Sequence, residues 1–213
     1  MTVPAHSYLR DPAAIYAESF RIAEAECDIA GLEPGLHRLA LRLVHACGDP
    51  DIAPLLRASQ GAVEAGVAAL GRGAAIFADC EMVRAGITRR LLPRSNEVVV
   101  TLNEEQTALI AARDGTTRSA AAVDLWDARL DGAVVAIGNA PTALFRLLER
   151  LGEGAPRPAL IVGMPVGFVG AAESKQALID GDHGCPFITL TGRRGGSPLA
   201  AAAVNALSLG AAP

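Results

Sequence analysis

Short apolar runs, each followed by a glycine and a polar loop, recur along the second half of this chain. They cover residues 134–137, 160–162 and 187–190, and each loop leads into a segment with a helical pattern. Short continuous apolar runs are typical of parallel strands that are buried on both faces. Two earlier runs, at residues 74–78 and 97–102, also have strand character, and the second is rich in β-branched residues. The pattern therefore predicts five strands.

Helical patterns fill the intervals between these strands. They lie at residues 80–85, 104–113, 119–130, 140–151 and 171–179, and a last helix is predicted at 198–207. An alternation of strands and helices favours right-handed crossovers between parallel strands. The fold class predicted is therefore α/β, with a mainly parallel five-stranded sheet that is flanked by helices.

The first 70 residues show helical patterns without a buried strand. Helices are predicted at residues 13–30, 36–46, 52–58 and 60–70. We interpret this part as helical cover for the sheet or as a dimerisation element. Because a length of 213 residues suits one domain, we expect a single domain, 1–213, with a helical N-terminal part to about residue 70 and an α/β core at 71–210.

Composition restricts the class of partner. The chain is 51 % hydrophobic, but no apolar stretch approaches the roughly 20 residues of a membrane-spanning helix. A net charge of −4 without a long basic run argues against nucleic acid. The four cysteines form no Cys-x-x-Cys pair, which argues against a zinc site or a disulfide framework, and the N-terminus lacks a secretory signal. We expect a cytoplasmic protein with a small-molecule ligand, and neither membrane nor nucleic acid as a partner.

The loops that leave parallel strands meet at the carboxyl edge of a sheet, where open α/β folds bind ligands. Three of these loops carry cations and hydrogen-bond donors, namely Asn139, Ser174, Lys175, Arg193, Arg194 and Ser197. Such a set suits a large anionic molecule, and the following helix N-termini add backbone N–H groups. The glycines could also serve only the tight turns. Neither a P-loop nor a Gly-x-Gly-x-x-Gly motif is present, so a nucleotide-dependent enzyme is disfavoured.

His45 is a candidate for acid–base chemistry, because histidine transfers protons near neutral pH. It lies near the end of the predicted helix 36–46 among apolar neighbours, where a histidine is more often a packing residue. His37 would point some 80° away from it on an ideal helix. His6 and His183 fall in predicted loops, and no histidine cluster has metal-ligand spacing. We therefore predict no metal site.

Two further positions have both a local and a functional interpretation. Asp79 follows the first strand, and capping of the next helix is favoured over catalysis. Arg118 lies among threonine and serine hydroxyls at a helix start, where it could bind a carboxylate or belong to an ordinary capped helix.

Several sequence blocks, taken together, resemble the precorrin-8X methylmutase family over nearly the whole chain and in the family's order. The blocks are Ser19-Phe20, Val44-His45-Ala46-Cys47-Gly48, Asp79-x-x-Met82-Val83, Thr117-Arg118-Ser119-Ala120-Ala121, Ala136-Ile137-Gly138-Asn139-Ala140-Pro141-Thr142-Ala143-Leu144, Val166-Gly167-Phe168-Val169-Gly170-Ala171-Ala172-Glu173-Ser174-Lys175 and Gly192-Arg193-x-Gly195-Gly196-Ser197. The fifth and sixth blocks are long and specific.

The resemblance implies an isomerase of corrin (vitamin B12) biosynthesis, which moves a methyl group from C-11 to C-12 of precorrin-8X and gives hydrogenobyrinate. It implies a homodimer with a Rossmann-like α/β fold, an active site near the subunit interface, and neither cofactor nor metal. The family's essential histidine falls on His45, which would protonate the ring C nitrogen and assist a 1,5-sigmatropic shift. Ser19, Thr88 and Arg118 fall in blocks that line the macrocycle or hold its carboxylates.

Other functions stay open at this point. A non-catalytic tetrapyrrole carrier would use the same pocket, and a nucleotide-dependent oxidoreductase is a weaker alternative. The same methyl shift could also act on cobalt-precorrin-8. The His-Ala-Cys-Gly block more closely resembles the metal-free, aerobic branch of the family.

Overall fold

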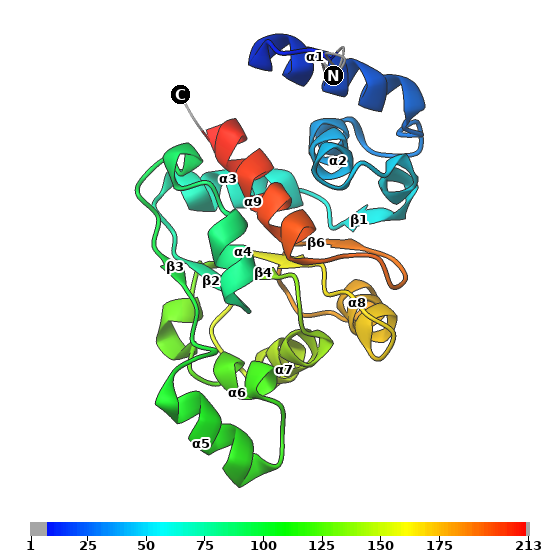
Figure 1. Cartoon of the computed structure of the whole chain (residues 1–213). Helices are drawn as coiled ribbons and strands as arrows, with labels where there is room; N and C mark the ends of the chain where they lie inside the picture. The colour runs from blue at the N-terminus through cyan, green and yellow to red at the C-terminus, as the bar shows by residue number, and fades with distance from the viewer. Residues whose placement is uncertain (1–7, 212–213) are drawn as a thin grey trace, which may run out of the picture.

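A mixed sheet forms the centre of the computed structural model, which describes residues 8–211 (Figure 1). Within these residues six strands pair in the order β1-β6-β5-β4-β2-β3. The strands are β1 (Leu56–Ala58), β2 (Ile76–Ala78), β3 (Val98–Val99), β4 (Val134–Ile137), β5 (Leu160–Gly163) and β6 (Phe187–Leu190). All neighbours are parallel except β1, which runs antiparallel to β6. The α/β class that the sequence predicted is confirmed.

Helices cover both faces of this sheet. The α-helices are α1 (Pro12–Glu26), α2 (Pro34–Cys47), α3 (Ala62–Gly71), α4 (Glu81–Gly86), α5 (Glu105–Asp114), α6 (Arg118–Val123), α7 (Pro141–Gly152), α8 (Ala171–Asp180) and α9 (Ser197–Ala211). Short 3-10 helices are η1 (Pro50–Leu55), η2 (Arg89–Leu91) and η3 (Asp127–Leu130). Helices α3, α4 and α9 cover one face, and α6, α7 and α8 cover the other. Helix α2 packs on α9, and α1 packs on α2 (Figure 1).

The core strands are buried on both faces, as their continuous apolar sequence requires. In β2, for example, Ile76 and Ala78 point into the core under α9, while Phe77 points into the core under α7. Val134 to Ile137 of β4 alternate in the same way and are all fully buried. Within residues 8–211 no helix is both long and apolar enough to cross a membrane.

The prediction of five strands and of a helix at residues 52–58 is wrong. The 3-10 helix η1 ends at Leu55, and the next three residues form the antiparallel edge strand β1. Pro54 lacks a backbone N–H and cannot continue an α-helical ladder, whereas Leu56 to Ala58 align with Leu190 to Ile188 of β6. The first 70 residues therefore contribute a strand to the sheet as well as helices.

Other predicted elements are also shorter than expected, and two of them have a clear physical reason. The strand predicted at 97–102 pairs only over Val98–Val99, because β3 is an edge strand and the chain then turns toward α5. The helix predicted at 119–130 ends at Val123 and resumes as η3. Between the two helices Trp126 is buried against Phe77 and donates its indole N–H to Thr101. A continuous α-helix is interrupted by this packing.

Candidate functional site

The loops after β2, β4, β5 and β6 all leave the sheet at its carboxyl edge, because these strands are parallel. The antiparallel strand β1 instead begins at this edge, so the segment before it arrives there. The Thr191 N–H donates to the carbonyl of Leu55 at 2.9 Å, which fixes η1 beside the loop after β6. The C-terminal end of α2 consequently lies next to the loops that the sequence predicted as a ligand site.

His45 occupies the last turn of α2 and is held from one side by α1. Its Nδ1 lies 2.7 Å from the hydroxyl oxygen of Ser19. The Phe20 ring stacks on the imidazole with centroids 4.9 Å apart, and the Tyr16 ring meets it edge-on at 5.6 Å. The imidazole is otherwise exposed, and no hydrogen bond to Nε2 is found among residues 8–211. One ring nitrogen is therefore fixed by a hydroxyl, while the other is free to meet a ligand.

Two hollows flank the contact between α1 and α2. One, of about 130 Å³, is lined by Ser19, Ile22, Ala23, Glu26, Val44, His45, Gly48 and Pro50. The other, of about 390 Å³, contains the cationic side chains Arg38 and Arg42 beside Tyr16 and Phe20. The guanidinium of Arg42 lies 5.4 Å from the centroid of the Phe20 ring. Because pockets for drug-sized ligands span roughly 300–1,000 Å³, the hollow at His45 is too small to enclose a large ligand.

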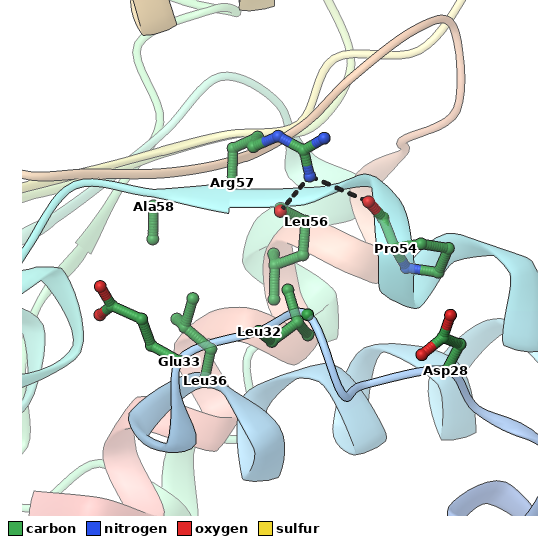
Figure 2. Close-up of a pocket in the computed structure, with 9 residues that line it drawn as sticks. Asp28, Leu32, Glu33, Leu36, Pro54, Leu56, Arg57 and Ala58 are labelled. Atoms are coloured by element: carbon green, nitrogen blue, oxygen red, sulfur yellow. Dashed lines mark hydrogen bonds between the residues drawn. The ribbon is translucent and has the colours of Figure 1, made fainter.

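Figure 2 shows another pocket, of about 360 Å³, between β1 and the segment that connects α1 to α2. Asp28 and Glu33 lie at its rim, and the guanidinium of Arg57 turns to the carbonyls of Pro54 and Leu56. No residue that the sequence analysis proposed for ligand binding lines it. Two carboxylates at its rim would also repel an anionic ligand.

Asp79 is buried at the end of β2 and holds the loop that follows β4. Its carboxylate accepts hydrogen bonds from the backbone N–H groups of Gly138, Asn139 and Ala140 at 2.8–3.0 Å. Burial raises the pKa of Asp79, and the three N–H donors act in the opposite direction. The prediction that Asp79 caps the next helix is wrong, because α4 has no side-chain cap. Asn139 is thus fixed at the carboxyl edge through its backbone.

The loops after β5 and β6 are interlocked. The Gly196 N–H donates to the carbonyl of Met164 at 2.8 Å, and a Cβ at Gly195 would collide with backbone oxygens of Met164 and Pro165. Phe168 at the tip of the first loop is 87 % exposed, and the guanidinium of Arg193 lies 5.6 Å from the centroid of its ring. The loops therefore present an apolar surface with an adjacent cation.

Three of the predicted ligand-binding residues are buried at this edge. Ser174 donates its hydroxyl to the carbonyl of Ala171, and the Ser197 hydroxyl lies 3.4 Å from the Cys80 thiol. Lys175 is the only lysine of the chain; its side chain is fully buried and its ammonium donates to the carbonyl of Arg194. Burial lowers the pKa of Lys175 to about 8. These three side chains bind protein atoms here, and ligand binding by them stays a prediction.

Thr88 and Arg118 lie away from His45. The Thr88 N–H donates to the side chain of Asn205 in α9. Arg118 begins α6 near β3, and its exposed guanidinium donates to the carbonyl of Leu102 and to Asn103. Helix α6 and the α1–α2 pair lie at opposite ends of the sheet (Figure 1). The structure thus brings Ser19 to His45 and Lys175 to the loop after β6, but it does not bring Arg118 to His45 within one chain.

No group of three or more histidine, cysteine, aspartate or glutamate side chains that could hold a metal ion occurs in the described part of the chain. His183 contacts the carbonyl of Ala177, and His37 contacts that of Leu32. His6, which was expected in a loop, lies outside the described residues.

Sequence reasoning missed several residues that shape this site. Tyr16 stands three residues before Ser19, so helical spacing could have placed it beside the same partner. Asp49 forms an ion pair with Arg194, N···O 3.1 Å, across 145 positions of sequence, and no local pattern signals such a contact.

Comparison with known proteins shows which family this chain resembles. Residues 14–209 match the family model described as precorrin-8X methylmutase. The precorrin-8X methylmutase of Pseudomonas aeruginosa is 55 % identical over 94 % of this chain and 97 % of that protein, and the one of a Sinorhizobium species is 52 % identical over 97 % and 98 %. A cobalt-precorrin-8 methylmutase of Priestia megaterium is 34 % identical over 93 % and 88 %.

A solved structure shows the same fold. The crystal structure of a precorrin-8X methylmutase from Thermus thermophilus superposes with a TM-score of 0.84 at 42 % identity, and the match covers 94 % of this chain and 98 % of that one.

Proposed function

The chain belongs to the precorrin-8X methylmutase family, and from this premise we propose that His45 donates a proton to precorrin-8X while a methyl group moves from C-11 to C-12. The enzyme is an isomerase of cobalamin biosynthesis, and its product would be hydrogenobyrinate. A shift within one molecule conserves all atoms, so the protein has to bind and orient the ring and to deliver and recover one proton.

The environment of His45 is the observation that carries this proposal. In the doubly protonated imidazolium, Nδ1–H donates to the Ser19 hydroxyl 2.7 Å away, and Nε2–H remains for the ring C nitrogen. Stacking on Phe20 fixes the plane of the imidazole, and the C-terminal end of α2 favours a positive charge. A proton donor in a fixed orientation contributes ~10²–10⁴-fold to a rate.

The chemistry of the surroundings suits a carboxylated macrocycle. Phe168 and Val169 are almost fully exposed apolar groups at the carboxyl edge, and Arg193 lies beside them. Arg38 and Arg42 line the groove on the other side of the α1–α2 contact. A broad apolar ring with acidic side chains needs such a combination of flat apolar surface and separated cations. We propose that Ser19, Thr88, Arg118, Asn139 and Arg193 bind the ring, and that Ser174, Lys175 and Ser197 act from beneath by fixing the loops.

We propose that the functional unit is a homodimer, in the cytoplasm. The hollow at His45 measures about 130 Å³, and Arg118 lies at the far end of the sheet. Five strand spacings of about 4.8 Å separate β1 from β3, or about 24 Å. A second copy that brings its Arg118 and Thr88 toward His45 would enclose the ring and supply the missing cation.

The metal-free ring is the substrate that we propose. The relatives at 55 % and 52 % identity are named for precorrin-8X, whereas the one from Priestia megaterium at 34 % is named for cobalt-precorrin-8. Turnover of precorrin-8X and of its cobalt complex, measured side by side, tests this preference; faster conversion of the cobalt form would contradict it.

Replacement of the proton donor tests the mechanism. His45→Ala should lower turnover of precorrin-8X by about 10²–10⁴-fold, while affinity for hydrogenobyrinate changes little, because the ring's carboxylates are bound elsewhere. Turnover is followed by the change in visible absorption, and affinity by titration of the product. His183→Ala is the matched control, since His183 lies after α8 and its ring nitrogen forms a hydrogen bond with the backbone carbonyl of Ala177.

The same experiment separates the enzyme from a tetrapyrrole carrier. A carrier would bind the product but leave the methyl group at C-11 even in the unmodified protein. Normal turnover by His45→Ala would show that the proton comes from another group.

A further inference from the structure

We propose that the Arg194–Asp49 ion pair, with Lys175 as its anchor, is a positioning device that sets the location of His45 relative to the ring-binding loops. This inference rests on the function proposed above and adds Arg194 and Asp49, which would act through His45 rather than on the substrate, to the loop-fixing role proposed there for Lys175.

The anchor is the only lysine of the chain. Lys175 lies in α8, directly after the loop that carries Phe168, and its fully buried ammonium donates to the main-chain carbonyl of Arg194. A hydrogen bond from an ammonium to a backbone carbonyl is charge-assisted and shielded from water here, so it holds the main chain of the loop after β6 firmly. Its lowered pKa of about 8 reflects the same burial.

The main chain at Arg194 is fixed from a second side as well. Gly195 packs so closely on the carbonyls of Met164 and Pro165 that no Cβ fits, and the Gly196 N–H donates to the Met164 carbonyl. The loop after β5 and the loop after β6 therefore form one unit, from which the side chain of Arg194 extends.

The side chain of Arg194 reaches the segment that follows α2, the helix that carries His45. Arg194 Nη1 lies 3.1 Å from one carboxylate oxygen of Asp49, while the other oxygen accepts the Asp51 N–H at 3.1 Å and caps η1. Asp49 comes four residues after His45, immediately beyond Gly48, which ends α2 in the left-handed region at φ 66°. The ion pair thus connects the ring-binding loops to the end of the helix that carries the proton donor.

A positional role explains this pair better than a stabilising one. The side chains of Arg194 and Asp49 are 48 % and 36 % exposed, and ion pairs in such settings add little to stability. A displacement of about 1 Å between a catalytic group and its substrate can nevertheless cost about 10²-fold in rate. Loss of the pair should therefore appear in kcat and leave folding and ligand affinity nearly unchanged.

The test is a double-mutant cycle with Arg194→Gln and Asp49→Asn. The amide of the Asp49→Asn variant would keep an oxygen that can cap η1, so only the ion pair is removed. Each single variant should lower kcat for precorrin-8X by about tenfold, the double variant should be no slower than either single one, and product affinity should stay within about twofold. Arg194→Lys, which keeps the cation, should recover most of kcat.

Arg150→Gln is the matched control. It removes the ion pairs that Arg150, near the C-terminal end of α7 and at the opposite edge of the sheet, forms with Glu153 and Asp124, and kcat should not change. Lys175→Met should reproduce the loss in kcat; if this variant does not fold, the Arg194 and Asp49 variants decide alone.

Several results would overturn the inference. Wild-type kcat in both single variants, or independent losses that multiply in the double variant, would show that the pair does not position His45. A loss of product affinity with unchanged kcat would show that Arg194 binds a ring carboxylate itself. The proposed function is judged separately, from turnover by the unmodified enzyme and by His45→Ala.

Discussion

Lys175 carries its charge in the interior of the protein, and this has a consequence for stability as a function of pH. The pKa of its ammonium is about 8 in the folded protein against an ordinary value of 10.5. Below pH 8 both the folded and the unfolded chain carry the proton. Between pH 8 and 10.5 the unfolded chain binds more protons than the folded one, so the contribution of Lys175 to stability rises with pH in this window.

We expect Lys175→Met to remove this dependence. The difference in the free energy of unfolding between wild type and variant should shift in favour of the wild type by up to about 1.4 kcal/mol per pH unit between pH 8 and 10.5. Urea titrations of both proteins at about pH 7.5, 9 and 10 measure the difference, and other ionisable groups cancel in the comparison. A constant difference over this range would show that Lys175 keeps an ordinary pKa.

At the scale of elements, the close approach of α9 to the end of β4 depends on one missing side chain. A Cβ at Gly138 would lie 2.7 Å from Ser197 Cα and 2.8 Å from Ala200 Cβ. Gly138 also donates its N–H to Asp79, so the loop cannot move away without losing that hydrogen bond. We expect Gly138→Ala to lower the free energy of unfolding by about 1–3 kcal/mol through overpacking.

Gly152→Ala provides the contrast. Gly152 is the last residue of α7, and a Cβ there would meet no atom within 4 Å. This substitution should raise stability by about 0.4–1 kcal/mol, because alanine restricts the unfolded chain. Denaturant midpoints of the two variants are sufficient for the comparison, and equal midpoints would argue against the close packing of α9 on β4.

The elements show where sequence patterns are sufficient and where they are not. Strands β4, β5 and β6 were predicted within one residue, because each is a continuous apolar run that needs burial on both faces. Strand β1 was missed, since three residues with the pattern buried, exposed, half-buried carry no detectable period. Its pairing depends on β6, far along the chain, and only tertiary structure supplies that information.

The candidate site follows the same rule. The family resemblance assigned His45 and Ser19 to the site. The local sequence pattern around His45 favoured a packing role for that histidine. The burial of Lys175, the three N–H groups around Asp79 and the Arg194–Asp49 pair all join segments far apart in sequence, and none leaves a local trace.

For the whole molecule, the proposed homodimer gives a decisive complementation test. If His45 of one copy and Arg118 of the other complete one site, His45→Ala and Arg118→Glu chains that are inactive alone should regain activity when co-expressed. A two-fold symmetric dimer has two equivalent sites. Random pairing of the two variants would leave about a quarter of all sites intact, and turnover should recover to about that fraction.

Sedimentation of each variant supplies the control, since both must still form dimers. Recovery near zero with intact dimers would mean that each site uses His45 and Arg118 of the same chain, and the arrangement proposed here would have to be abandoned.

The pairing of β1 with β6 also orders events during synthesis. The α1–α2 pair leaves the ribosome early, yet β1 aligns with residues 188–190 and α2 packs on α9, which ends at Ala211. The helices that carry Ser19 and His45 must therefore wait, without their final neighbours, until α9 has been synthesised. Such long-range closure is slow compared with local folding, so the contact between Ser19 and His45 should reach its final position late, and loss of α9 would disturb it.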